Sequence, residues 1–232
     1  MIKRIRFSAR RPGVSPDAFA ARWRDAMALV VDAPDDARPA RVTLCFTLAD
    51  VDGCDGRHDG IAFESFADAA HLARADAWLD AAAGQAYLVA LGAASDPAAS
   101  AVVVVDEQVM RGAEWLEQRW RDGGDAFKHM AVAMRAKGLT QAEFSARWRS
   151  RAGRVGTTPI PDEARGLAYA QDHPVPRVTG EWPFDAVNEV WFDDFDGLHR
   201  RVEWFRENLA DGEDDLVRES WFVVAREEVL RA

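Results

Sequence analysis

Three polar side chains at alternate positions of one segment have the types that acid–base chemistry needs. Tyr169, Gln171 and His173 lie at and just beyond the end of a predicted strand, 165–171. Alternate side chains of a strand project to the same side, so we expect a phenol, an amide and an imidazole to converge there. Such a set can bind and polarise a carbonyl group, and His173 can transfer a proton near neutral pH. The alternative is a strand end whose polar groups meet solvent.

A buried acid is the second candidate. Glu189 and Trp191 share one face of the predicted strand 187–192. A carboxylate inside a sheet is costly unless it is paired or functional, and Trp191 beside it would suit a flat apolar ligand. The alternative for Glu189 is an ion pair with Arg147 or Arg149 on the preceding helix, and this is the reading we favour.

His129 is the third candidate, on the predicted strand 127–134. The alternation of this strand places His129 on the face opposite Met130 and Val132. It is a candidate for lining the same cavity, and the alternative is a core histidine whose hydrogen bonds are satisfied.

Trp148 and Arg149 are candidates because the chain carries the same residues twice. Trp148 could form the aromatic wall of a ligand cavity and Arg149 could bind an anionic group, as could their counterparts Trp23 and Arg24. The alternatives are a core anchor for each tryptophan and a surface ion pair, for example with Glu143, for each arginine.

These residues belong to a chain that contains one unit twice. Residues 14–24 and 139–149 both end in Ala-Arg-Trp-Arg, and Phe19 corresponds to Phe144 at the same constant offset. A repeat of this length is a whole domain rather than a solenoid element. We therefore divide the chain into residues 1–111, a linker of residues 112–125, and residues 126–232.

Each half predicts the element order β-α-β-β-α-β, which is the ferredoxin-like order. The predicted strands are 2–9, 41–49, 61–64 and 101–110, then 127–134, 165–171, 187–192 and 216–229. The predicted helices begin at Pro16, Phe66, Thr140 and Phe195, with a short polar helix in the linker. Because two helices cover only one face of each sheet, we predict an α+β fold in which the two ferredoxin-like halves pack sheet to sheet, as a dimer fused within one chain.

Composition limits the classes of partner. The chain has 232 residues, 48% of them hydrophobic, and a net charge of −10. We therefore expect a small-molecule ligand and no nucleic-acid or membrane partner, and further homodimerisation stays open. The start of the chain alternates like a strand rather than like a signal peptide, and Cys45 and Cys54 lack a metal-type partner set, so we expect a cytoplasmic protein without a metal site.

Residues 166–173 and 184–195 resemble the EthD-like family, and residues 2–24 match its opening strand, Arg-Pro-Gly turn and Trp-Arg helix more weakly. The resemblance implies a dimeric α/β-barrel and an enzyme without a cofactor; some relatives bind haem, but nothing marks one of the five histidines here as its ligand. The sequence departs from the family at Met27 and Ala152, where the usual pattern has a histidine. The first half departs further, so we expect any activity in the second half.

What the resemblance implies about function is a cofactor-independent enzyme that acts on a small apolar or aromatic carbonyl or phenolic metabolite. In this reading His173 moves a proton and Tyr169 donates a hydrogen bond to the developing oxyanion, in a dehydration, cyclisation or isomerisation. The alternatives are a cofactor-free oxidoreductase such as a monooxygenase of the same superfamily, and a non-catalytic binding protein with a decayed site.

Overall fold

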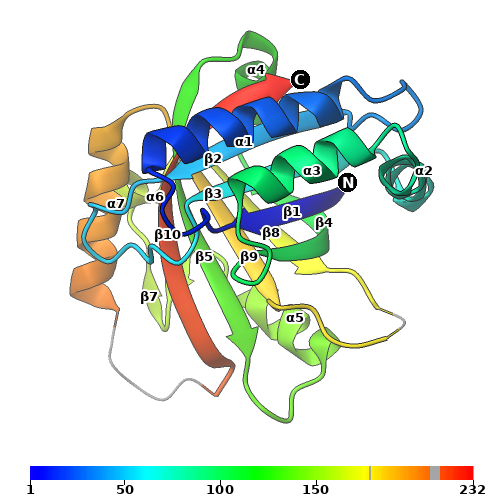
Figure 1. Cartoon of the computed structure of the whole chain (residues 1–232). Coiled ribbons are helices and arrows are strands. Elements are labelled where there is room, and N and C mark those ends of the chain that lie inside the picture. Colours follow the sequence, from blue (N-terminus) through cyan, green and yellow to red (C-terminus); the bar gives the residue numbers. More distant parts are fainter. Residues whose placement is uncertain (178, 210–214, 232) are drawn as a thin grey trace.

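The structure contains the eight predicted strands and the predicted helices (Figure 1), but the helix predicted from Phe66 begins only at Ala69 because Phe66 still belongs to a strand. The second half also has two short strands and a short helix, within residues 154–165, that were not predicted. The computed structural model describes residues 1–177, 179–209 and 215–231. The first half comprises β1 (Ile2–Ser8), α1 (Pro16–Val31), β2 (Arg41–Thr47), β3 (Gly60–Phe66), α2 (Ala69–Asp80), α3 (Gln85–Ala94) and β4 (Ala101–Arg111). Helix α4 (Ala113–Asp122) follows. The second half comprises β5 (Asp125–Arg135), α5 (Gln141–Ser150), β6 (Arg154–Val155), β7 (Thr158–Pro159), α6 (Asp162–Arg165), β8 (Ala168–Pro174), β9 (Ala186–Phe192), α7 (Phe195–Asn208) and β10 (Val217–Arg231).

The two repeated helices begin at caps that the sequence encodes. The Ser15 hydroxyl accepts a hydrogen bond from the Ala18 backbone N–H at 3.3 Å, and Pro16 occupies the first helical position of α1. In α5, Thr140 and Glu143 form a reciprocal capping box. The predicted starts of both helices are confirmed.

Eight of the described strands form one closed barrel in the order β1-β3-β2-β10-β5-β9-β8-β4, and β6 and β7 form a separate two-stranded sheet. Within each half the order is that of a ferredoxin-like sheet, and the halves join at both edges: β2 pairs with β10, and β4 pairs with β8. The predicted α+β fold is therefore confirmed as a dimeric α/β-barrel within one chain. The two sheets do more than pack face to face, because backbone hydrogen bonds close the ring at both seams.

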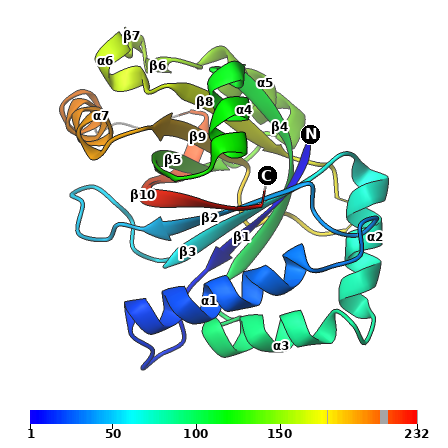
Figure 2. The same cartoon turned by 90° about the horizontal axis from the view of Figure 1, so that it is seen from above.

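The inside of the barrel is a core shared by both halves. Ile5, Phe63 and Val105 from the first half pack with Met130 and Val223 from the second. Helices α1, α2 and α3 cover the strands of the first half and α5, α6 and α7 lie outside those of the second, whereas α4 lies over one end of the barrel (Figure 2), where Leu116 packs with Ala168, Ala170 and Trp191. Among the described residues, no helix is both long enough and apolar enough to cross a membrane.

Candidate functional site

A cavity of about 370 Å³ lies on the outer face of the second sheet, beneath α7 and the segment that follows α5. Strands β5, β8, β9 and β10 form its floor, and the side chains around it are largely apolar, aromatic or basic. The residues used below are His129, Ala131, Trp148, Ala152, Tyr169, Asn188, Val190, Arg201, Phe205 and Phe222.

The cavity exists because the second half has a shorter first helix. Helix α1 has 16 residues, and its Trp23 and Met27 are fully buried against the first sheet. Helix α5 has 10 residues and ends at Ser150, where the chain turns away into the small hairpin of β6 and β7. Trp148 therefore lies at the wall of a cavity, whereas its counterpart Trp23 is a core residue.

Tyr169 is the predicted catalytic residue that lines this cavity. Gln171 donates a hydrogen bond from Nε2 to the Tyr169 Oη at 2.6 Å, which leaves the phenolic proton free to be donated to a ligand. Burial raises the pKa of Tyr169, with Gln171 opposing that shift. The phenol is therefore a protonated donor at neutral pH.

His173 continues the same line of side chains but lies away from the cavity. Its Nε2 is 3.2 Å from the Gln171 Oε1, and the ring is buried. Burial, and then the charge of Arg149, lowers the pKa of His173 to about 4. Gln171 and His173 are not among the described residues that line the cavity, so the catalytic role of His173 stays a prediction.

His129 is the imidazole that lines the cavity, on the face opposite Met130 as predicted. Arg201 donates from Nε to the His129 Nδ1 at 3.1 Å, so the proton of the neutral ring is on Nε2. Burial, and then the charge of Arg201, holds the pKa of His129 well below its ordinary value of 6.5. Among the described residues no group hydrogen-bonds to Nε2, and His129 is therefore a neutral donor available to a ligand.

Trp148 and Arg149 have separate environments. Trp148 stacks on Phe144 at 5.4 Å between ring centroids and donates from Nε1 to the Asn188 Oδ1 at 2.9 Å. Arg149 donates from Nε to the Gln108 Oε1 at 3.0 Å and does not line the cavity. The alternative of a surface ion pair with Glu143 is therefore wrong for Arg149, whose described side-chain partner is the neutral amide of Gln108.

Arg24, the counterpart of Arg149, pairs with Glu228 of β10 through two contacts of 2.7 Å. This bond links the first helix of one half to the last strand of the other, so it supports the seam between β2 and β10 rather than a surface helix pair.

Glu189 and Trp191 point into the barrel, away from the cavity. The Glu189 carboxylate pairs with Lys3 at 2.5 Å and also with Lys128, which corrects the prediction that Arg147 or Arg149 is its partner. Trp191 donates from Nε1 to Glu227 at 3.3 Å and contacts Lys128 through its ring at 4.6 Å. Glu189 and Trp191 do share one face of the strand, as predicted, but this face lies inside the barrel rather than against the helices.

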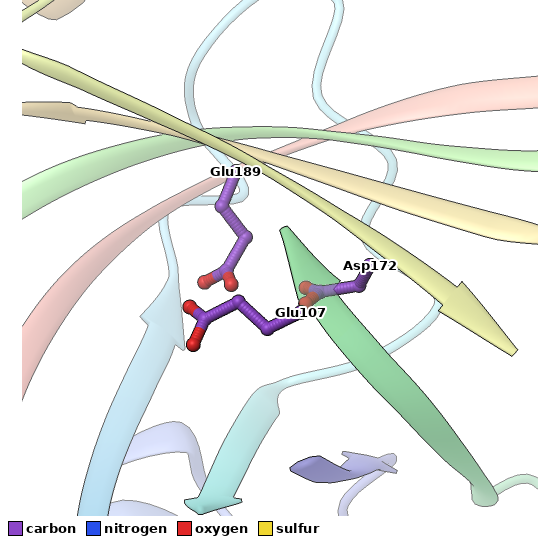
Figure 3. Close-up of side chains that lie close together, drawn as sticks. All are labelled: Glu107, Asp172 and Glu189. Carbon is purple, nitrogen blue, oxygen red and sulfur yellow. The ribbon is translucent and has the colours of Figure 1, made fainter. Parts of the chain in front are cut away.

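Glu107, Asp172 and Glu189 bring three carboxylates together at this place, projecting toward one another (Figure 3). Their oxygens lie within 4.8 Å of one another, as the ligands of a cation would. The Lys3 ammonium already lies among them, at 2.6 Å from Glu107 and 3.3 Å from Asp172. We therefore interpret the group as an internal ion cluster in which Lys3 is the cation.

The protonation states within the cluster differ. Burial raises the pKa of Asp172 well above its ordinary value, and the charges of Glu189 and Glu107 add to this against the opposing charge of Lys3. For Glu189 the two ammonium groups of Lys128 and Lys3 outweigh burial and lower the pKa to about 2. Burial and the neighbouring carboxylates thus favour the protonated form of Asp172, whereas the two ammonium groups favour the charged form of Glu189.

The cavity is strongly basic although the chain is acidic. Five arginines line it, whereas no Asp or Glu of the described chain does: Arg111, Arg151, Arg154, Arg165 and Arg201. Arg165 pairs with Asp162 at 3.0 Å and Arg151 with Asp215 at 3.2 Å, and Arg111 donates to backbone carbonyls. Arg201 differs from these because it is buried.

The sequence analysis missed Arg201, Phe205 and the turn around Gly153. A signal for Arg201 was present: Leu198, Arg201 and Phe205 recur at helical spacing, so the arginine lies on the apolar stripe of α7. The hairpin of β6 and β7 has two residues in each strand, too few to give a periodic pattern.

No protein-family profile matches the chain, and no curated protein matches its sequence. Among solved structures, a candidate monooxygenase from Lactobacillus acidophilus NCFM is 12% identical, with a TM-score of 0.49 over 97% of this chain and 93% of that one. A tryptophan variant of chlorite dismutase from Candidatus Nitrospira defluvii is 10% identical, with a TM-score of 0.43 over 97% of this chain and 90% of that one. Similarity at this level carries no argument about activity, and the fold assignment rests on the strand order of the barrel itself.

Proposed function

We propose that the second half binds a small, mostly apolar carbonyl or phenolic molecule and stabilises its enolate or phenolate without a cofactor. The observation that carries this proposal is the pair of neutral donors, Tyr169 and His129, on the floor of an aromatic cavity that no described carboxylate lines. We also propose membership of the EthD-like family, on the residues of the second half that resemble it.

The chemistry follows from which protons are free. The Tyr169 hydroxyl and the His129 Nε2–H both have a proton to donate, because Gln171 and Arg201 engage the other side of each group. Two donors to one ligand oxygen stabilise that oxygen more as it becomes negative, which lowers the cost of removing a proton from the carbon or oxygen beside it. Hydroxide or a buffer base from solvent takes the proton, since no described carboxylate lines the cavity. Return of the proton to a different carbon would complete an isomerisation.

The aromatic walls suit a flat ligand. Phe205 and Phe222 are both within 5.3 Å of the His129 ring, measured between centroids, and Trp148 lies at the opposite wall beside Asn188. Rigid aromatic side chains bury an apolar ring with little loss of conformational freedom. This setting makes each hydrogen bond to the ligand oxygen stronger than it would be in water.

One observation favours a second candidate, a binding protein without catalysis. The position of the family's usual histidine holds Ala152, which lines the cavity, and no described carboxylate is present to act as a base. Such a protein would bind the same ligands and leave them unchanged.

Deuterium exchange into acetophenone tests the proposal. Protein and ketone are mixed in D₂O, exchange at the methyl group is followed by NMR, and binding is checked by saturation transfer. We expect exchange above the buffer rate, and a loss of roughly 100–1000-fold, or down to the buffer rate, in Tyr169→Phe and in His129→Gln. The control is Tyr87→Phe, which alters the chain's other tyrosine, buried in the first half. Binding without exchange would leave the binding protein, and no binding would refute both candidates for this ligand class.

A further inference from the structure

Arg201 is a buried cation without a carboxylate partner in the part of the chain that the structure describes. Its side chain is 7% exposed, donates from Nη1 to the Ala164 carbonyl oxygen at 2.7 Å and from Nε to His129, and lies 4.5 Å from the centroid of the Phe205 ring. Each of these contacts is neutral. A buried charge is costly unless an opposite charge accompanies it, and no described residue of this chain supplies the carboxylate that would offset the burial of Arg201.

The first half shows what such a partner looks like. On the equivalent outer face, the buried Glu64 carboxylate accepts hydrogen bonds from Arg4 at 2.9 Å and Arg6 at 2.6 Å. Burial raises the pKa of Glu64, but the two guanidinium groups more than offset this and hold it below its ordinary value. Here the protein supplies both the cations and the anion.

The strand registers identify the corresponding place in the second half. Arg4 is opposite Glu64 between β1 and β3, and His129 is opposite Val190 between β5 and β9. Arg4 and His129 are related by the offset of the repeat, so Val190 takes the position of Glu64. Val190 lines the cavity. At this position the second half therefore has a valine and a cavity where the first half has a buried carboxylate.

We propose that the cavity takes its ligand as an anion: a carboxylate or phenolate group occupies the place that Glu64 fills in the first half, and Arg201 is its counter-ion. The proposal rests on the cavity of the proposed function and names its substrate class, small aromatic or apolar acids. It holds whether or not the bound anion then reacts.

The described residues around Arg201 are neutral donors or positive charges, so they favour a bound anion. Tyr169 of β8 and His129 of β5 face it as neutral donors, and Arg111 of β4 and Arg165 of α6 add positive charge at the cavity wall. Burial lowers the pKa of Arg201 to about 9, so the side chain is still charged at neutral pH. The pKa is low because no carboxylate among the described residues offsets the effect of burial. A bound anion would pair with it and restore the balance that Glu64 gives the first half.

The test uses 4-nitrophenol, whose phenolate is coloured, and 4-nitroanisole, its methyl ether, which cannot ionise. We expect nitrophenolate to bind at least tenfold more tightly than nitroanisole, and the bound phenol to ionise at least one pH unit lower than the free one. Arg201→Met should remove at least tenfold of the phenolate affinity while changing nitroanisole affinity less than threefold. Equal binding of the two probes would overturn the proposal and leave the proposed function standing, and binding of neither would overturn both.

Two further variants separate charge from size and from folding. Val190→Glu rebuilds the first-half arrangement, so it should abolish nitrophenolate binding, whereas Val190→Gln controls for side-chain size and should bind the phenolate far better. Arg119 is a buried arginine with a carboxylate, 3.8 Å from Glu227, so Arg119→Met should lower the melting temperature more than Arg201→Met does. Equal phenolate binding by the two Val190 variants, or a larger loss of melting temperature in Arg201→Met, would contradict the proposal.

Discussion

Replacing Lys3 by methionine tests whether the ion cluster inside the barrel holds the halves together. Lys3 of β1 lies 2.6 Å from Glu107, 2.5 Å from Glu189 and 3.3 Å from Asp172 and is 2% exposed. Its charge therefore offsets carboxylates from both halves of the chain. Methionine keeps the length and removes the charge, so the substitution isolates the electrostatic contribution.

Loss of one member of a buried ion pair costs about 3–5 kcal/mol, because its partners keep their charge in a place that water does not reach. For a chain of this size that corresponds to a fall in melting temperature of roughly 6–20 °C. Urea unfolding followed by tryptophan fluorescence and calorimetry measures both quantities. The control is Lys137→Met at an exposed lysine, which should change the free energy of unfolding by less than about 0.5 kcal/mol.

The pH dependence gives the sharper test. Without Lys3, the folded-state pKa of Asp172, which is already above its unfolded value, rises further, and Glu189 loses one of the two positive charges that lower its pKa. A group with a raised folded pKa stabilises the protein below its unfolded pKa and loses that contribution as the pH rises through the folded pKa. The deficit of Lys3→Met should therefore be largest near pH 8 and shrink toward pH 5. A deficit below 1 kcal/mol, or one that is constant over this range, would refute the electrostatic account.

Three shorter predictions follow. His173→Phe should flatten the pH dependence of the free energy of unfolding between about pH 6.5 and 4. The lowered pKa of His173 stabilises the fold above pH 6.5, and this contribution, up to about 3 kcal/mol, is lost as the pH falls. An unchanged slope in urea titrations would contradict this prediction. Trp148→Phe should cost about 1 kcal/mol through the lost bond to Asn188, and a neutral result by urea unfolding would show that water replaces it. Gly166→Ala should lower stability by about 2 kcal/mol or more in calorimetry, since φ is 72° and an added Cβ would lie 2.6 Å from the Trp191 carbonyl oxygen; tolerance would mean that the turn relaxes.

The fold was largely readable from the sequence because its signals are local and appear twice. The caps at Ser15 and Thr140, the alternation of the strands and the repeated Ala-Arg-Trp-Arg all depend on neighbouring residues. The two seams of the barrel could not be read, because pairing of β2 with β10 and of β4 with β8 joins segments far apart in the chain. The sequence of an edge strand does not indicate which distant strand pairs with it across the seam.

The candidate site was readable only in part, for a related physical reason. Tyr169 and His129 were found, since strand alternation gives the face of each side chain. Alternation does not say which face is the barrel interior, so Glu189 was given a helix partner instead of the two lysines inside. Arg201 was missed because it is notable for having no carboxylate partner among the described residues, and a sequence pattern does not show which buried charges are left unpaired.

The covalent joining of the two halves has a consequence for how such a site can arise. In a symmetric dimer of identical subunits, every substitution appears in both outer faces at once, so a cavity opened for a ligand weakens the structure twice. In this chain the face that carries Arg4 and Glu64 can keep its internal salt bridge while the other face changes freely. Joining the halves in one chain therefore allows one outer face to stay closed by its own ion pair while the other holds a cavity and a buried charge without a carboxylate partner among the described residues, a difference that two identical subunits cannot have.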